Sequence, residues 1–507
     1  MRRLRAEPVD ILDGSGILEQ QDFVLPGRLP LVWIRTYSSA DCEVEGMCGY
    51  GWLTPADIRL EVMPDEGFAL LSQSEGVTLF AALPQADGRE QGITGLPDGS
   101  RLWRQTVNGE VLWHIEQENA PILHFRGKQG VLPVRHIIDR NGNGWRFEWN
   151  GSELMQIREF THAGMTGREI LVTQQDERLI ALRLRNALDG EITPLTRYEY
   201  DTGRQLKAEI DALSNPRRFV YRQHHMVTHI DRNGQGFHYE YNEAWQVVHA
   251  WGDGGVWEYR FAWHTLLNEA EVSDTQGNIS RITFDENGLP VAELDALGGN
   301  TVFRYDDFGR TVEVIEPDGS LYRWEYDDQG RMTAEHMPDG CCIQAEYDDY
   351  GALLTLIDEK GASWRSEFDE RGNLIIGTDP TGVVSRYQYD AFGQLIAAQV
   401  PGSSPSHYQY DRFGFLRAAG LAGAGDTRFR YSVRGALLER VDEDGGTAHF
   451  HRDIKDRLVA VVDAAGGELR IAYDREDDPV CFTDELGGVT RFHYNGTGML
   501  TACETPD

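Results

Sequence analysis

A repeat of 21 residues constrains the fold of this chain more than any other feature of its sequence. Over residues 284–494 an aromatic residue recurs every 21 positions for ten steps without an insertion, and an aspartate usually follows it. A fixed period in this range is the signature of a repeat protein, in which each unit packs mainly on its neighbours. The aromatic positions, which we call anchors, are Phe284, Tyr305, Tyr326, Tyr347, Phe368, Tyr389, Tyr410, Tyr431, Tyr473 and Tyr494, and Arg452 stands at the remaining one.

Each repeat predicts two strands and two turns. In residues 321–326 aromatic side chains at Tyr322, Trp324 and Tyr326 alternate with mostly polar ones, and a period of two is typical of a β-strand. The sequence Asp-Asp-Gln-Gly at 327–330 predicts a turn, because Asp bonds to nearby backbone and Gly allows positive φ. Residues 331–337 read as a return strand, and Pro-Asp-Gly at 338–340 predicts the second turn. The repeats therefore predict an antiparallel meander with an aromatic ladder on one face and a polar ladder on the other.

A meander of this length has to curl. The period extends backward, less regularly, through Trp263, Tyr241, Tyr221 and Tyr200. About 30 strands at ~4.8 Å each make roughly 140 Å of sheet, and open sheets rarely exceed about ten strands without curling. Rolled into one turn, such a sheet encloses a lumen of about 35 Å, the size of a domain of ~100 residues. The predicted fold is an all-β meander curled into a hollow spiral shell, and the sequence leaves open which face lines the lumen.

The repeats resemble the YD repeats of the Rhs family, and so does the opening of the chain. YD repeats occur in bacterial polymorphic toxins, in the B and C components of insecticidal toxin complexes and in teneurins. The resemblance implies a spiral β-shell that encloses a C-terminal toxin, often in an effector of type VI secretion with a PAAR domain ahead of the shell. The opening residues that carry the resemblance are Pro8, Asp10, Pro26, Gly27, Arg28, Pro30, Arg35, Tyr37, Gly49, Gly51 and Trp52.

Three segments follow from these patterns. Residues 1–57 are the opening segment, which the resemblance makes a plug at one end of the shell. Residues 58–197 are a degenerate β-repeat region, and residues 198–507 are the YD-repeat array. The array is still in rhythm 13 residues before the last residue, and no PAAR-like segment precedes Pro8. We therefore expect the front part of a shell, possessing a free sheet edge through which two copies or a complementary half-shell can pair.

Composition excludes several functions. The net charge of −34 argues against a nucleic-acid-binding surface, which needs basic patches. No segment has the apolar run of a signal peptide or of a membrane span. The six cysteines follow no regular spacing, which favours free thiols in a reducing cytoplasm. The resemblance implies that this is a bacterial cytoplasm, from which the protein is exported by a route that needs no signal peptide.

No motif predicts catalysis, a cofactor or a metal. Residues 139–144 resemble half of a calcium loop, but Asn150 stands where a bidentate Glu is expected. The pair His224 and His225 lacks a partner at zinc-like spacing, and the adjacent Cys341 and Cys342 lie on opposite faces of a strand. The acidic residues recur in every repeat, so they are typical of turns and solubility rather than of one active site.

The repeats predict a hollow shell with no catalytic motif, and the resemblance implies that this shell encloses and helps deliver a toxin polypeptide. Its expected partners are the toxin domain or a complementary half-shell, together with secretion spike or chaperone proteins. Two alternatives stay open at this point. One is a YD-repeat surface that binds glycans or a receptor, because aromatic stripes stack on sugars. The other is a truncated fragment of a self-cleaving effector.

Overall fold

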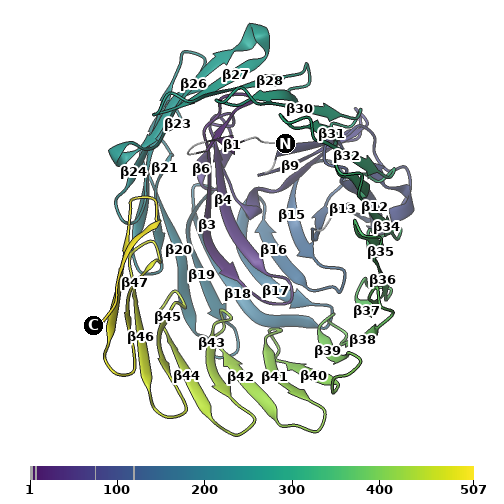
Figure 1. The fold of residues 1–507 in the computed structure, drawn as a ribbon, viewed down its shortest axis with the longest axis vertical. Helices are drawn as coiled ribbons and strands as arrows, with labels where there is room; N and C mark the ends of the chain where they lie inside the picture. Colours follow the sequence, from purple (N-terminus) through teal and green to yellow (C-terminus); the bar gives the residue numbers. More distant parts are fainter. Residues whose placement is uncertain (1–3, 6–7, 75, 118–119, 507) are drawn as a thin grey trace.

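The computed structural model describes residues 4–5, 8–74, 76–117 and 120–506. Across these ranges the chain forms 49 β-strands and four short 3-10 helices, and it contains no α-helix. Within the same ranges there is no helix with the length and apolarity needed to cross a membrane. The prediction of an all-β antiparallel meander curled into a spiral is confirmed (Figure 1).

The first strands fall into two groups. The opening segment contains β1 (Leu4–Arg5), β2 (Val9–Asp10), β3 (Ile17–Leu25), β4 (Leu31–Ser38), β5 (Glu45–Gly46), β6 (Gly49–Tyr50), β7 (Trp52–Leu53) and the helix η1 (Pro55–Asp57). The group that follows, which we call the cap, contains β8 (Arg59–Met63), β9 (Phe68–Gln73), β10 (Gly76–Phe80), η2 (Arg89–Gln91), β11 (Ile93–Thr94), β12 (Arg101–Val107), β13 (Glu110–Glu116), β14 (Ile122–Arg126), β15 (Gly130–Ile138), β16 (Gly144–Asn150), β17 (Glu153–Thr161), β18 (Gly164–Gln175) and β19 (Arg178–Asn186).

The array follows without a break in the sheet. Its irregular part contains β20 (Ile192–Tyr200), β21 (Leu206–Asp211), β22 (Pro216–Arg222), β23 (His225–Ile230), β24 (Gly236–Tyr241), β25 (Val247–Gly252), η3 (Asp253–Gly255), β26 (Val256–His264), η4 (Thr265–Leu267), β27 (Glu269–Asp274) and β28 (Ile279–Phe284). Its regular part contains β29 (Pro290–Leu294), β30 (Asn300–Tyr305), β31 (Thr311–Ile315), β32 (Leu321–Tyr326), β33 (Met332–His336), β34 (Cys342–Tyr347), β35 (Leu353–Ile357), β36 (Ser363–Phe368), β37 (Leu374–Thr378), β38 (Val384–Tyr389), β39 (Leu395–Gln399), β40 (Ser406–Tyr410), β41 (Leu416–Leu421), β42 (Asp426–Tyr431), β43 (Leu437–Val441), β44 (Thr447–Arg452), β45 (Leu458–Val462), β46 (Glu468–Tyr473), β47 (Pro479–Thr483), β48 (Val489–Tyr494) and β49 (Leu500–Glu504).

One register repeats through the regular array. In the hairpin of β30 and β31, Phe303 pairs with Val314 and Arg304 with Glu313, and the register then shifts by one residue at the anchor Tyr305. The same shift precedes Tyr326, and it recurs through the array as far as Tyr494. A bulge of this kind increases local strand twist and bends the sheet. Because every repeat contributes the same bend, the sheet curls steadily.

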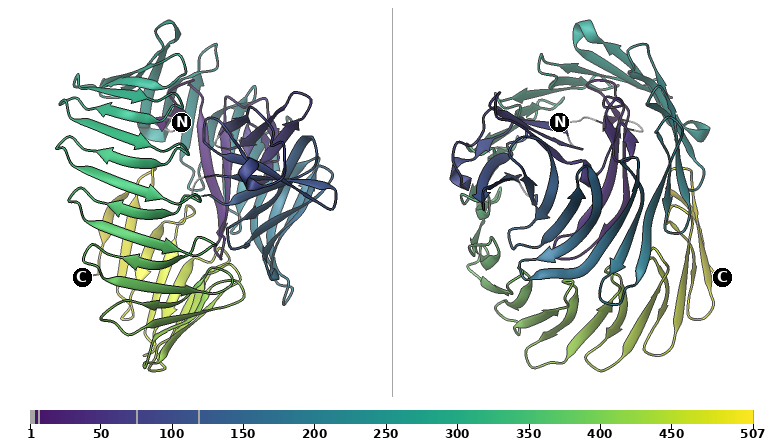
Figure 2. Two further views of the ribbon diagram at one scale, coloured as in Figure 1. Left: turned by 90° about the vertical axis from the view of Figure 1, so that its right-hand side faces the viewer. Right: turned by 180° about the vertical axis from the view of Figure 1, so that it is seen from behind.

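The opening segment lies on the concave side of the curled sheet (Figures 1 and 2). Trp33, Tyr37 and Trp52 are buried in one core together with Trp145 of the cap and Phe219 of the array. A second, smaller core joins residues 9 and 11 of the opening segment to β24–β28. The part of the concave face from β8 to β28 is therefore already covered by the chain itself.

The regular array forms a wider turn of the spiral that lies beside the cap (Figures 1 and 2), and we call it the outer layer and the preceding strands the inner layer. Hydrogen bonds join Asn141 to Asn373, Asn143 to Phe392 and Asn233 to Asp474, across 232, 249 and 241 residues of sequence. One turn of the spiral therefore contains about as many residues as separate the two partners of each of these bonds. We call the line of contacts between the two layers the seam.

Candidate functional site: the concave face and the seam

The anchor tyrosines and the aspartates after them have separate structural tasks. The hydroxyl of Tyr326 donates to the backbone oxygen of Thr311 at 2.8 Å, and so ties β32 to the start of the preceding return strand. Asp327 then accepts hydrogen bonds from the backbone N–H groups of Gln329 and Arg331, both at 2.9 Å, and this fixes the turn. The same tyrosine bond, to the residue 15 positions earlier, is made by Tyr305, Tyr347, Tyr410, Tyr473 and Tyr494.

Arg452 fills the tyrosine role in its repeat, because its Nε donates to the backbone oxygen of Leu437 at 3.1 Å. Phe284 and Phe368 carry no hydroxyl, so these two anchors can pack against their neighbours but cannot donate the hydrogen bond.

An arginine after the turn links one repeat to the next. Arg310 donates from Nε to the Asp306 carboxylate at 2.6 Å and from Nη1 to the backbone oxygen of Asp327 at 3.3 Å. Its guanidinium also lies 4.8 Å from the ring centre of Tyr326, within cation–π range. This role of the arginine was not predicted from the sequence, although Gly-Arg recurs after the anchor aspartates at 309–310 and 330–331.

The aromatic ladder faces the inside of the spiral. In the irregular part of the array, the residues two before the anchors are buried against the opening segment or beside it: Tyr198, Phe219, Tyr239, Phe261 and Ile282. Successive side chains of a strand alternate between the faces of its sheet, so the same positions of the regular array share this concave face. These positions are uncharged in every regular repeat: Phe303, Trp324, Ala345, Ser366, Tyr387, Tyr408, Phe429, Phe450, Ile471 and Phe492.

The charged side chains gather on the convex face. Glu313 forms ion pairs with Arg304 at 2.9 Å and with Arg323 at 3.0 Å, one from each neighbouring strand. The arginines of these pairs are more than half exposed, so each pair contributes little to stability. The arrangement leaves a concave wall that is mostly aromatic, aliphatic and small, and a convex wall that is solvated.

The opening motif builds a buried ionic centre under the array. Arg35 is fully buried and holds Asp22 in a two-bond ion pair, with N–O distances of 2.7 and 2.8 Å. Tyr198 donates to the same carboxylate at 2.6 Å, and Trp33 donates to the Tyr198 hydroxyl at 3.1 Å. The guanidinium of Arg35 also lies 4.7 Å from the Trp52 ring. The motif therefore fixes the opening segment to the concave face.

The remaining residues of the opening motif pack tightly against neighbouring side chains or stabilise turns. A side chain at Gly51 would meet the Tyr37 ring at 2.7 Å, and Gly51 and Gly49 both have positive φ. The Tyr37 hydroxyl in turn donates to the His224 backbone oxygen at 3.0 Å. Asp10 caps its own turn by accepting from the Leu12 N–H, with Pro8 just before it, and Pro30 directly precedes β4.

One stretch of the opening segment reaches the outer layer. Arg28 donates to the backbone oxygen of Arg412 at 2.9 Å and lies 4.5 Å from the Phe392 ring centre. Pro26 accepts a hydrogen bond from the buried Arg168, and a side chain at Gly27 would collide with that arginine. The opening segment thus contacts both layers of the spiral.

The seam ends in an ionic cluster. Lys455 of the outer layer lies 2.9 Å from Asp211 of the inner layer and 2.6 Å from Asp477. Arg232 pairs with Glu209 at 2.7 Å and approaches Asp211 at 3.6 Å. Burial, together with the charge of Asp22, raises the pKa of Glu209 to about 7. Lys455 and Asp211 are 244 residues apart in the sequence, so the repeat pattern could not have indicated their contact.

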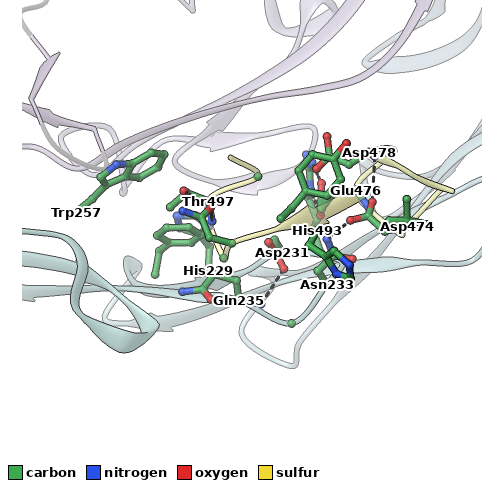
Figure 3. Close-up of a pocket in the computed structure, with 18 of the residues that line it drawn as sticks. His229, Asp231, Asn233, Gln235, Trp257, Asp474, Glu476, Asp478, His493 and Thr497 are labelled. Carbon is green, nitrogen blue, oxygen red and sulfur yellow. Dashed lines mark hydrogen bonds and ion pairs between the residues drawn. The ribbon is translucent and has the colours of Figure 1, made fainter. Parts of the chain in front are cut away.

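A cavity of about 1030 Å³ opens beside this cluster, between β3 and the last hairpins (Figure 3). Carboxylates of Glu19, Asp231, Asp474 and Asp478 line it, next to aromatic side chains that include Trp257. Burial and the charge of Glu476 raise the pKa of Asp231, although hydrogen bonds from the Gln235 backbone oppose the shift. The cavity therefore combines accumulated negative charge with an aromatic wall.

The residues that resembled metal ligands have other partners. Asp139 accepts from the backbone N–H groups of Asn141 and Asn143 and from the Asn143 amide, as in a side-chain-stabilised turn. His225 lies with its Nε2 3.5 Å from the Cys42 sulfur, a pairing that the sequence did not suggest. In the described part of the chain, no group of three or more His, Cys, Asp or Glu residues is arranged to hold a metal ion.

Comparison with known proteins agrees with the repeat geometry. Residues 284–321 and 305–340 match the RHS Repeat family, and the two matches begin one repeat apart. Residues 341–495 match the family described as Teneurin YD-shell, and residues 6–80 match a domain of unknown function (DUF6531). The chain belongs to the Rhs/YD-repeat family.

Two of the curated relatives that this Rhs/YD-repeat chain matches are named as toxins. It is 28% identical over 333 residues to the toxin protein Tse5 of Pseudomonas aeruginosa, a match that covers 56% of this chain and 24% of the relative. It is 26% identical over 272 residues to the double-stranded DNA deaminase toxin A of Burkholderia cenocepacia, covering 48% of this chain and 16% of that protein. A probable deoxyribonuclease RhsB of Dickeya dadantii is 25% identical over 60% of this chain and 20% of the relative. The Rhs/YD-repeat chain therefore spans at most about a quarter of the relatives that it matches.

Two solved structures match most of this chain at low sequence identity. The TcdB2-TccC3-TEV crystal structure matches 97% of this chain and 31% of its own, with 11% identity and a TM-score of 0.47. The Photorhabdus luminescens Tc holotoxin pore matches 93% of this chain and 30% of its own, with 10% identity and a TM-score of 0.44.

Proposed function

We propose that this chain is the wall of a shell that encloses a toxin polypeptide. The observation that carries the proposal is the concave face of the regular array. The positions two before the anchors are uncharged from Phe303 to Phe492, and their partners on the return strands are charged only at Glu335 and Arg440. No segment of the described chain covers these positions as the opening segment covers β8–β28. A solvated sheet face usually carries polar side chains, so an aromatic face that curls around a space fits a polypeptide cargo.

The cargo proposed here is a separate toxin domain that performs the chemistry, while this chain performs none. Two of the relatives are named for activity on DNA, which makes a nucleic-acid-modifying enzyme a reasonable cargo. The acidic cavity beside the seam suggests that part of the cargo is basic. We further propose that residues 1–57 close one end as a plug and that β49, whose outer edge has no paired strand among the described residues, accepts a strand of a complementary half-shell.

Delivery to a target cell completes the proposal. The resemblance to Rhs effectors supports type VI secretion, in which a spike or chaperone protein carries the loaded shell out without a signal peptide. The proposed advantage is steric, because a toxin inside the wall cannot reach its substrate in the producing cell.

Protease protection tests the proposal. A passenger of about 100 residues, fused after Asp507, is expected to resist a protease that degrades the same passenger alone. An electron-microscopy map should show a curled sheet around a cavity, whereas a flat or solid particle, or equal digestion of all passengers, contradicts the proposal.

A further inference from the structure

The convex face of the cap carries a row of histidines next to an arginine. Trp103, His114, His124, His136 and Arg146 are direct cross-strand partners on β12–β16. The Trp103 and His114 rings stack at 3.8 Å, and His114 meets His124 edge-on at 4.3 Å. Trp145, the neighbour of Arg146, is buried in the core under the opening segment, so the row faces the other way.

Burial keeps these histidines neutral. It lowers the pKa of His114 to about 3, with the charge of His124 adding to the effect. It also lowers the pKa of His124 and of His136 to about 4. His136 accepts a hydrogen bond at Nε2 from Arg146 at 3.2 Å, which suits a neutral ring. The positive charge of the row therefore belongs to arginine.

A β-bulge brings a second arginine to the same place. His124 pairs with His136 and Phe125 pairs with Val134, which leaves Arg135 as the extra residue of β15. Bulges redirect a side chain and are common beside functional sites. Val134 is fully buried, whereas Arg135 and His136 together line a cavity of about 760 Å³. The bulge thus turns Arg135 toward the histidine row.

The carboxylates of this cavity are already paired. Glu110 forms an ion pair with Arg126, and Glu148 lies 3.5 Å from Arg158 and accepts a hydrogen bond from Gln156 at 2.6 Å. No carboxylate of the described chain pairs with Arg135 or Arg146. The Nε of Arg135 is buried without a hydrogen-bond partner, and burial and the charge of Arg126 lower its pKa.

A chain with a net charge of −34 thus leaves two arginines in the lining of one cavity, Arg135 and Arg146, without a carboxylate partner in the described chain. Leaving a buried donor unsatisfied is unfavourable, and a bound anion removes that penalty.

We propose that this cavity binds an oxyanion, either a carboxylate or a phosphate, carried on an apolar body. Guanidinium groups present paired N–H donors that match both oxyanions. Leu112 and Trp149 supply an apolar wall, and the volume is in the usual range for small-ligand sites. The site lies on the convex side of the cap, so a ligand reaches it without entry into the proposed lumen. It is therefore independent of cargo enclosure.

Titration of the intact chain with small anions tests the site. Phenyl phosphate, benzoate, inorganic phosphate and the cation phenyltrimethylammonium are added while tryptophan fluorescence or heat is recorded. The aromatic oxyanions are expected to bind with saturation, more tightly than inorganic phosphate and more weakly as NaCl is raised, and the cation is expected not to bind. The tighter of phenyl phosphate and benzoate identifies the preferred group.

Arginine variants locate the binding. R135Q and R146Q are each expected to weaken it by roughly ten-fold or more, and R135K is expected to fall between R135Q and the unchanged chain. R183Q is the matched control. Arg183 is an exposed arginine on β19, it points away from the buried face of that strand, and it lies outside the cavity. Unchanged binding in R135Q and R146Q, or no saturable binding up to about 10 mM, overturns the proposal. Near-ultraviolet circular dichroism verifies that each variant is folded.

Discussion

Arg217 and Glu476 form an ion pair across the seam, although 259 residues separate them in the sequence. The same carboxylate accepts a hydrogen bond from the backbone N–H of Arg232. A single residue in an outer turn thereby holds two elements of the inner layer. The pair lies at the rim of the acidic cavity, so it links closure of the spiral to the shape of the inner space.

Removal of this carboxylate should loosen the seam. E476Q leaves Arg217 partly buried without its counter-charge, which is expected to cost about 2 kcal/mol of local stability. Hydrogen exchange in β23 and β46 measures the loss. E468Q is the matched control, because the Glu468–Arg470 pair is exposed and its loss should leave the exchange of both strands unchanged. Equal exchange in both variants contradicts the role given to Glu476.

Acid should loosen the same seam. Burial acts to raise the pKa of Glu476, but the hydrogen bond and charge of Arg217 and the backbone bond from Arg232 outweigh it, so the pKa is lowered. A carboxylate with a lowered pKa binds fewer protons in the folded state than in the unfolded state. It therefore stabilises the fold above its ordinary value of 4.5, and this contribution is lost as the pH falls through the folded value.

Asp211 acts in the same direction. Burial opposes the shift, but bonds from the Asn215 backbone and from Lys455 lower its pKa. Glu209 acts in the opposite direction, because its raised pKa favours the folded state at low pH and this contribution is lost as the pH rises through about 7. Exchange protection of β46, corrected for the intrinsic rate, is expected to fall between pH 5 and pH 3. E476Q should flatten that fall, and an identical pH profile for E476Q refutes the assignment.

The strands and turns were predictable because their causes are local. The strand predicted at 321–326 is β32 (Leu321–Tyr326), and the return strand predicted at 331–337 is β33 (Met332–His336). Alternation, Asp and Gly determine both, and all of these lie within one repeat. The bulge before each anchor could not be predicted from the sequence. It is a shift in the pairing of two strands, and the alternation within one strand does not specify which residue of the partner strand lies opposite the anchor.

The seam and the lining face required the structure. Arg217 has no feature in the sequence that distinguishes it from exposed arginines such as Arg470, since its partner is defined only by the pitch of the spiral. The sequence distinguished an aromatic face of the array from a polar face, but it did not show which of them lines the lumen. The opening segment resolves this, since Trp33 and Trp52 pack on the anchor side of β20 and β22.

The hydroxyl group of an anchor tyrosine should contribute measurably to the free energy of unfolding. Y326F removes the donor to the Thr311 backbone oxygen and is expected to reduce stability by about 1 kcal/mol. Y322F is the matched control, since Tyr322 stacks on Trp324 in the same strand and its hydroxyl has no hydrogen-bond partner in the described chain. Urea unfolding of the two variants in parallel measures the difference. A larger loss in Y322F than in Y326F contradicts the role of the anchor hydroxyl.

The buried pair of Arg35 and Asp22 should behave differently from the seam, because water does not reach it. R35M leaves the Asp22 carboxylate without its counter-charge and is expected to cost about 3–5 kcal/mol, with release of the opening segment from the concave face. The double variant D22L/R35M removes both charges and is expected to regain most of this loss, since apolar residues of similar volume often replace a buried pair without cost. Protease cleavage between β3 and β4, read by mass spectrometry, reports the release. If the double variant is cleaved as fast as R35M, the centre holds the segment by its specific hydrogen bonds to Tyr198 rather than by charge balance.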